Sequence, residues 1–161
     1  MPETKETPEE LSPILYKLVE KMSFRLRRAG YRARGVHVSL LYRDWSYWHR
    51  GAVQPELVFD SRDIYRVAYK LLIHSPYRRP VHTLAVSCFD LDTTRSLQLA
   101  LLSDVDKKDR FMAAVDRVNS RWGDFVITPA RMLGTASAVP DRIAFGGIKE
   151  LEELIFSTPE I

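Results

Sequence analysis

One stretch of the sequence decides the fold: Arg78-Arg79-Pro80-Val81-His82-Thr83-Leu84-Ala85-Val86-Ser87-Cys88-Phe89-Asp90-Leu91. Its side chains alternate between two kinds, and a period of two over this length predicts a β-strand. The apolar side, which should pack on helices, comprises His82, Leu84, Val86 and Cys88. The other side is small and carries hydroxyls: Val81, Thr83, Ala85 and Ser87. Such a strand is either half-buried with a solvated face, or a flat surface that receives a phosphate backbone beside the paired arginines.

The chain before this strand begins with a predicted helix. In Thr7-Pro8-Glu9-Glu10 the threonine can cap the helix and Glu10 can close a capping box. Apolar residues then recur at three- and four-residue steps until Gly30, as in a helix that covers a core. Pro13 leaves two alternatives, because it either kinks this helix or places the true cap at Ser12.

A hairpin and a second helix follow. Residues 33–43 and 47–58 alternate as strands, and Asp44-Trp45-Ser46 connects them tightly. Asp60 and Ser61 then cap a helix with an apolar stripe. The order helix, strand, strand, helix, strand predicts an α+β fold with two helices on one face of an antiparallel sheet.

The expected architecture is ferredoxin-like, with a four-stranded antiparallel sheet whose first strand is truncated or lies upstream in a longer parent chain. We divide the chain into an α+β domain at 1–92, a linker at 93–105 and a C-terminal extension at 106–161. The extension should contain a helix from Lys107 to Trp122, a short strand at 124–127 and a tail. The inward side chains of that helix should be Phe111, Ala114, Val115 and Val118.

Charge and composition narrow the class of protein. The 161 residues carry a net charge of only +3. Nine basic side chains nevertheless lie between Lys17 and Arg50, opposed by Glu20 and Asp44, which indicates either a polyanion-binding face or a solvated helix. Trp45 and Trp48 either pack at the core and edge or stack on bases. A lone cysteine fits a reducing cytoplasm, and no apolar run approaches the roughly 18 residues of a membrane helix.

No catalytic constellation is present in the sequence. We find no phosphate-cradling glycine loop, no nucleophile elbow and no His-x-x-x-His pair. Asp90 and Asp92 lie close together, but without a third carboxylate nearby they favour loop solvation or helix capping over a metal site. The sequence therefore predicts a binding module without a cofactor, a metal or catalysis of its own.

Four stretches together resemble the little-finger domain of Y-family translesion DNA polymerases, the C-terminal domain of the ImpB/MucB/SamB type. Residues 80–91 resemble its last sheet strand, 18–30 its first helix and 34–50 its hairpin. Residues 115–123 resemble the helix that follows in the branch with longer tails. The resemblance implies a domain that binds duplex template–primer DNA beside the catalytic core of a parent polymerase and does not polymerise by itself.

The resemblance also implies DNA-binding residues. An open sheet face would carry His37, Ser39, Tyr47, His49, Thr83, Ala85 and Ser87. Near the DNA backbone would lie Arg34, Arg50, Ser61, Arg62, Arg78 and Arg79. Such contacts position a duplex without reading its sequence. The family tends to carry basic residues where Ser39 and Leu41 stand here, which implies weaker binding.

A second site is implied by Gln98-Leu99-Ala100-Leu101-Leu102, which resembles the Gln-Leu-x-Leu-Phe peptide that docks bacterial polymerases on the sliding clamp. Leu101 and Leu102 would enter an apolar pocket while Gln98 hydrogen-bonds at its edge. Leu102 in place of phenylalanine should bury less area. Two alternatives stay open: these leucines simply pack, and the whole domain is a ferredoxin-like module whose basic face binds another acidic partner.

Overall fold

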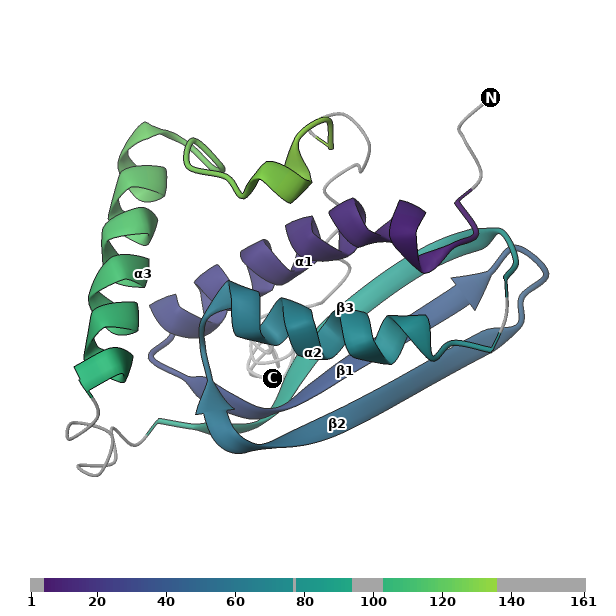
Figure 1. The fold of residues 1–161 in the computed structure, drawn as a ribbon, viewed down its shortest axis with the longest axis horizontal. Helices are drawn as coiled ribbons and strands as arrows, with labels where there is room; N and C mark the ends of the chain where they lie inside the picture. The colour runs from purple at the N-terminus through teal and green to yellow at the C-terminus, as the bar shows by residue number, and fades with distance from the viewer. Residues whose placement is uncertain (1–4, 77, 94–102, 136–161) are drawn as a thin grey trace, which may run out of the picture.

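A computed structural model describes residues 5–76, 78–93 and 103–135. The elements run in this order: α1 (Pro8–Arg28), β1 (Arg32–Tyr42), β2 (Tyr47–Val58), α2 (Ser61–Ile73), β3 (Val81–Asp92), α3 (Ser103–Trp122) and a short 3-10 helix, η2 (Ala130–Met132). Helices α1 and α2 lie over one face of the sheet, and α3 stands across the end of α1 (Figure 1). The predicted α+β class with two helices on one sheet face is confirmed. Among the described residues, no helix is long and apolar enough to cross a membrane.

The sheet contains three antiparallel strands in the order β2-β1-β3 within the described residues. The predicted fourth strand is not seen there. The chain before α1 nevertheless touches the outer edge of β3, because the Val81 N–H donates to the carbonyl of Lys5 at 3.0 Å. A further strand that joined this sheet beside β3 would pair along the same edge.

Helix α1 begins at the predicted capping box. The Glu10 N–H donates to the Thr7 hydroxyl at 3.3 Å, and the Thr7 N–H donates to the Glu10 carboxylate at 3.1 Å. Pro13 lies inside the helix, and the helix continues through it. The alternative cap at Ser12 was therefore wrong. Ser12 is buried in the helix, and its hydroxyl lies 2.7 Å from that of Tyr65 on α2.

The core lies between the two helices and the central strand β1. Side chains of β1 alternate as predicted, with Val36, Val38 and Leu40 buried. From β3, Leu84, Val86 and Cys88 pack against this core, also as predicted.

The predicted faces of Val81 and His82 were wrong, because the alternation of β3 breaks at its first residues. Val81 packs against the core, and His82 is exposed. Leu41 pairs with Thr83 whereas Tyr42 pairs with Val81, so His82 is an extra residue in the strand. An extra residue of this kind reverses the side-chain alternation that precedes it.

Helix α3 turns a charged side toward the domain, against prediction. Phe111 is 57% exposed, whereas Met112 is buried beside two aspartates that reach arginines of the domain. Ala114 is exposed, and Val115 and Val118 are only half-buried. The arrangement follows from charge, because Arg27 and Arg32 attract Asp116 and Asp109 to the same side of the helix.

The segment after α3 forms turns where a strand was predicted at 124–127. Phe125 adopts a left-handed φ of 65°, which interrupts an extended backbone. The Asn119 side chain replaces a strand partner, since its carbonyl oxygen accepts from the Ile127 N–H at 2.9 Å. The chain then passes over α1 (Figure 1), and Met132 of η2 packs into the core.

Candidate nucleic-acid interface

The sheet face turned away from α1 and α2 carries four cross-strand rows of side chains. The rows are Val53–Gly35–Phe89, Gly51–His37–Ser87, His49–Ser39–Ala85 and Tyr47–Leu41–Thr83. All seven residues expected on the open face therefore lie on one surface. Most of the side chains are small or carry a hydroxyl or imidazole, so the surface offers hydrogen bonds and close approach to a partner.

Two histidines lie beside each other on this surface. His37 Nε2 lies 3.0 Å from His49 Nδ1, and the ring of Tyr47 stacks on His49 with 5.4 Å between centroids. Burial lowers the pKa of His37, and the neighbouring His49 lowers it further. His37 is therefore neutral at pH 7, which leaves the middle of the face without a fixed positive charge.

Phe89 is a member of this surface that the sequence analysis did not assign to the site. Its ring lies against Gly35, where a Cβ atom would meet the ring at 2.3 Å, and near Gly51, where the corresponding distance is 3.4 Å. The two glycines thus leave room for an aromatic ring on the sheet. The period of Thr83, Ala85 and Ser87 extends to Phe89 and could have revealed it.

The paired arginines lie at the end of the sheet near the hairpin turn. Arg79 forms an ion pair of 2.6 Å with Asp44. Hydrogen bonds from Ser46, and then the contact with Arg79, lower the pKa of Asp44. Arg78 donates to the Ser75 carbonyl at 2.8 Å. Both arginine side chains are exposed, but each is held by contacts within the chain.

The two tryptophans differ in environment. Trp48 packs against the core, as one alternative predicted. Trp45 occupies the hairpin turn with a φ of 66° and is 74% exposed. Its ring lies 5.8 Å from that of His82, so an aromatic pair marks the same end of the sheet as the paired arginines.

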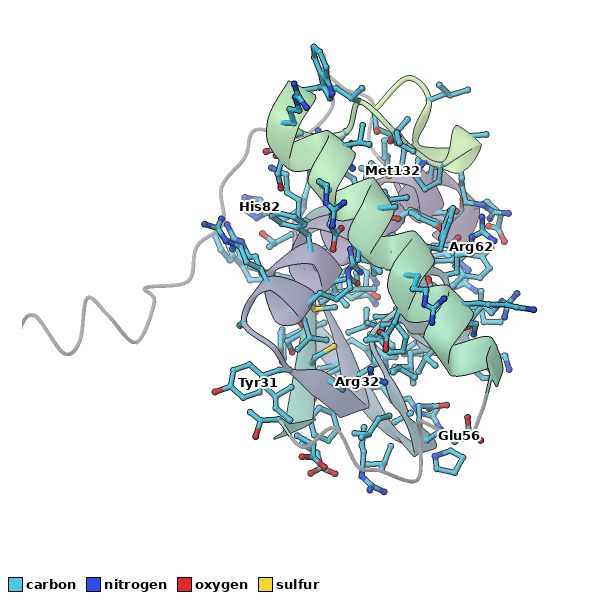
Figure 2. The ribbon with its side chains drawn as sticks, turned by 90° about the vertical axis from the view of Figure 1, so that its left-hand side faces the viewer. Tyr31, Arg32, Glu56, Arg62, His82 and Met132 are labelled. Carbon is cyan, nitrogen blue, oxygen red and sulfur yellow. The ribbon has the colours of Figure 1, made fainter. Side chains whose placement is uncertain are left out.

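The other expected backbone contacts are scattered. Arg50 pairs across the sheet with Val38, which places it on the helix side of the edge strand β2. Arg62 belongs to the helix layer at the start of α2 (Figure 2). Arg34 is exposed at a register shift in β1. The structure thus does not bring these three arginines into the rows of the open face.

Ser61 lies apart from the open face. It is buried, and its hydroxyl donates to the Glu20 carboxylate at 2.9 Å and accepts from Arg27 at 3.4 Å. Burial raises the pKa of Glu20, and the hydrogen bond from Ser61 opposes this rise. Ser61 thus holds the interior of the fold together, and we leave it out of the candidate interface.

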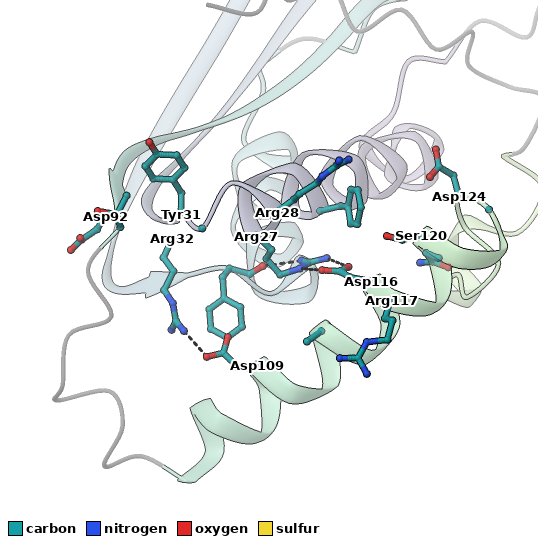
Figure 3. Close-up of a pocket in the computed structure, with 17 residues that line it drawn as sticks. Arg27, Arg28, Tyr31, Arg32, Asp92, Asp109, Asp116, Arg117, Ser120 and Asp124 are labelled. Carbon is teal, nitrogen blue, oxygen red and sulfur yellow. Dashed lines mark hydrogen bonds and ion pairs between the residues drawn. The ribbon is translucent and has the colours of Figure 1, made fainter. Parts of the chain in front are cut away.

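Much of the basic block between Lys17 and Arg50 contacts the C-terminal part of the chain. The Lys17 ammonium donates to the Thr135 carbonyl at 3.2 Å, and Lys21 lies over the Phe125 ring at 5.6 Å. A cleft of about 810 Å³ separates the end of α1 from α3. Two arginine–aspartate pairs, Arg27–Asp116 and Arg32–Asp109, cross it (Figure 3). Four of the nine basic side chains of the block therefore contact the C-terminal part of the same chain.

The first 101 residues match the model of the impB/mucB/samB family C-terminal domain. The chain belongs to this family. Two relatives are enzymes named DNA polymerase IV, from Pelotomaculum thermopropionicum and Moorella thermoacetica. The first is 31% identical over 134 residues, covering 83% of this chain and 33% of the relative. The second is 31% identical over 132 residues, covering 81% of this chain and 33% of the relative.

This impB/mucB/samB domain spans about a third of the length of those relatives. The resemblance found in the sequence is confirmed at the level of the family. The expected clamp-binding residues Gln98, Leu99, Leu101 and Leu102 lie outside the described residues, as does any contact that they make. Within the described residues, no three His, Cys, Asp or Glu side chains gather into a group that could hold a metal ion.

Proposed function

We propose that this impB/mucB/samB domain lays its open sheet face on the duplex template–primer of a DNA polymerase that acts in DNA repair and damage tolerance. It serves there as an accessory to the catalytic core and contributes no catalysis itself. The observation that carries the proposal is the gathering of seven expected contact residues on one face of the sheet, the face turned away from α1 and α2. The family match and the relatives named DNA polymerase IV support a role in such an enzyme.

The composition of the face suits a phosphate backbone better than base edges. Hydroxyls of Ser39, Thr83 and Ser87 donate to phosphate oxygens, and imidazoles do so from His37 and His49. Ala85, with its small side chain, permits close approach in the row that it shares with Ser39 and His49. Because the hydroxyl donors carry no charge and the pKa of His37 is lowered, we expect binding that is weak and independent of base sequence, with arginines at the sheet end adding a salt-dependent part.

A single added charge in the middle of the face tests this proposal. We expect Ser39→Glu to weaken binding of a fluorescent duplex by about tenfold at low salt, because a carboxylate there repels phosphates. Ser120→Glu is the matched control, since Ser120 is an exposed serine on α3 that gives the same change in charge. Fluorescence anisotropy with two unrelated duplexes measures both variants. Equal affinities for Ser39→Glu and the wild type would remove the open face from the proposal.

Salt dependence separates DNA from other partners. Each phosphate neutralised by the domain should contribute a slope of roughly 0.9 in a plot of log affinity against log salt. We expect a shallow slope, because few cations lie on the face. Absence of any duplex binding at low salt would favour the alternative, a module that binds an acidic protein.

We also propose that Gln98–Leu102 docks on the sliding clamp. The support is the order of residues and their place in the linker that follows the last sheet strand. An extended peptide with paired leucines suits an apolar pocket. Titration with the sliding clamp tests it: Leu101→Ala/Leu102→Ala should abolish binding, while Leu97→Ala, just outside the peptide, should retain it. Equal binding by both variants contradicts the proposal.

A further inference from the structure

Helix α3, which lies in front of the rest of the domain in the view of Figure 2, carries an apolar stripe on an exposed face. The stripe consists of Phe111, Ala114, Val118 and Trp122, at steps of three and four residues that share one helix face. Val118 is half-buried, and the other three are exposed. Phe111 is 57% exposed and Trp122 is 68% exposed. Two large aromatic side chains left open on one helix face indicate a binding surface.

The opposite side of α3 explains why the stripe remains uncovered. Asp109 and Asp116 face the domain and pair with arginines there. Met112, which lies between the two aspartates in the sequence, is buried. The ion pairs therefore fix the rotation of the helix. With that rotation fixed, the stripe cannot turn inward without breaking both arginine–aspartate pairs.

Basic side chains border the stripe. Arg117 and Arg121 lie one turn apart along the side next to it, and the Arg121 guanidinium lies 5.3 Å from the centre of the Trp122 ring. A partner for this face should thus combine apolar side chains with acidic ones. A second copy of α3 offers the same positive charges and is disfavoured by repulsion.

We propose that residues 148–156 of the same chain bind this face of α3. Their sequence is Ile148-Lys149-Glu150-Leu151-Glu152-Glu153-Leu154-Ile155-Phe156. Ile148, Leu151 and Ile155 recur at steps of three and four residues, the pattern of an amphipathic helix. Three glutamates and one lysine give the segment a net negative charge, which complements the arginines beside the stripe.

The tether is long enough for this contact. The Lys17 contact fixes Thr135 beside α1, and α1 ends against α3. Residues 136–147 then connect Thr135 to the acidic segment, and a connection of that length spans up to about 40 Å. The stripe from Phe111 to Trp122 is roughly 17 Å long, which is less than half of the reach of this connection. Because the two partners share a chain, a modest affinity suffices for binding.

A disulfide trapping experiment on the full chain tests the proposal. In a Cys88→Ser background, we expect Ala114→Cys/Leu151→Cys to form an intrachain disulfide about tenfold faster than Ser120→Cys/Leu151→Cys, because Ser120 lies outside the stripe. Peptide mapping and gel mobility distinguish intrachain from interchain bonds. Equal rates in the two variants, or interchain bonds alone, would overturn the proposal.

The fluorescence of Trp122 provides a second test without engineered cysteines. If residues 148–156 cover its ring, a chain that ends at Gly147 should show red-shifted emission, and the shift should vanish in a Trp122→Phe background. A shortened chain with unchanged emission would count against the contact. Circular dichroism on each variant shows that the domain remains folded, so that loss of fold is not mistaken for loss of docking.

Discussion

Arg27 of α1 holds Asp116 of α3 through two hydrogen bonds, from Nε at 2.7 Å and from Nη2 at 2.6 Å. The same guanidinium donates to the Phe59 carbonyl at 3.0 Å, so one side chain joins α1, the β2–α2 connection and α3. The side chains of the pair are only 11% and 20% exposed. A forked, largely desolvated pair of this kind is strong and specific in direction. It explains how a helix with an outward apolar face stays attached.

Removal of one partner of this pair should release α3. We expect Asp116→Ala to speed amide exchange in α3 by about a hundredfold, the equivalent of about 3 kcal/mol, because Arg27 loses its counter-charge while buried. Exchange in β1 should be unchanged. Hydrogen exchange with mass spectrometry measures both regions, with Ser120→Ala as the control on the same helix. If α3 stays protected in Asp116→Ala, the ion pair does not hold it.

A methyl group at Gly35 should conflict with the ring of Phe89. We expect Gly35→Ala to lower the free energy of unfolding by about 1–3 kcal/mol, since the ring must move from a site where a Cβ would approach to 2.3 Å. Gly51→Ala is the matched control, because its Cβ would meet neighbours only at 3.4 Å. Urea denaturation gives both values. In a double-mutant cycle, Phe89→Ala should remove most of the cost of Gly35→Ala, and strict additivity would contradict the contact.

The single thiol should be unreactive in the folded domain. Burial raises the pKa of Cys88 to about 12 from 9.0. The thiolate is the reactive form, so we expect alkylation at pH 8 to be at least about a hundredfold slower in the native protein than in urea. Because the unfolded chain loses this proton first, stability should also fall as pH rises above 9 toward 12. If the native protein were alkylated as fast as the unfolded chain, the result would contradict the burial of the Cys88 side chain in β3.

Acidification should strengthen DNA binding by the open face. His37 is neutral at pH 7 because burial and His49 lower its pKa below 6.5. As pH falls through this lowered pKa the ring gains a positive charge, and we expect duplex affinity to rise by about fivefold between pH 7.5 and 5.5. His37→Gln should show a smaller rise. Anisotropy at both pH values measures it, and an identical pH response in the two proteins would exclude His37 from the contact.

Protonation of His37 should also lower the free energy of unfolding. Lower pH should therefore decrease stability while it increases duplex affinity. The folded pKa lies below the unfolded value, so the unfolded chain takes up the proton first as pH falls below 6.5. The contribution of neutral His37 to stability is therefore fully present above this pH and is lost as the pH falls through the lowered pKa of the folded state. Thermal denaturation of the free domain at the same two pH values separates this loss from the gain in DNA affinity.

Local sequence signals predicted most of the α+β domain. The capping box at Thr7 and the alternation of Val36, Val38 and Leu40 depend on residues near in sequence, and both are confirmed. The predictions failed where contacts between residues far apart in the sequence determine the local structure. The bulge at His82 depends on how β3 pairs with β1, and the rotation of α3 depends on Arg27, far away in the chain. The periodicity of apolar residues does not reveal an ion pair between two distant elements, such as Arg27–Asp116.

Strand parity predicted which residues share the open sheet face, but it could not place the arginines and Ser61. Residues such as Ser39 and Ser87 follow from strand parity, so their shared face emerges once β1 and β3 pair. The positions of the arginine side chains cannot be predicted from strand parity, because a long flexible side chain can form an ion pair with any nearby carboxylate. Arg79 pairs with Asp44 of the hairpin turn, and Ser61 donates a hydrogen bond inward to Glu20. Those contacts join residues that the sequence separates widely.

The two aspartates of α3, Asp109 and Asp116, stand seven residues apart and are matched to two arginines of the domain. The two carboxylates thus take the place beside these arginines that phosphate groups of a nucleic acid would otherwise occupy. The two pairs neutralise two arginines on the helix side of the domain. For a duplex that binds as we propose, the open sheet face is thereby favoured, because part of the positive charge on the helix side is already balanced.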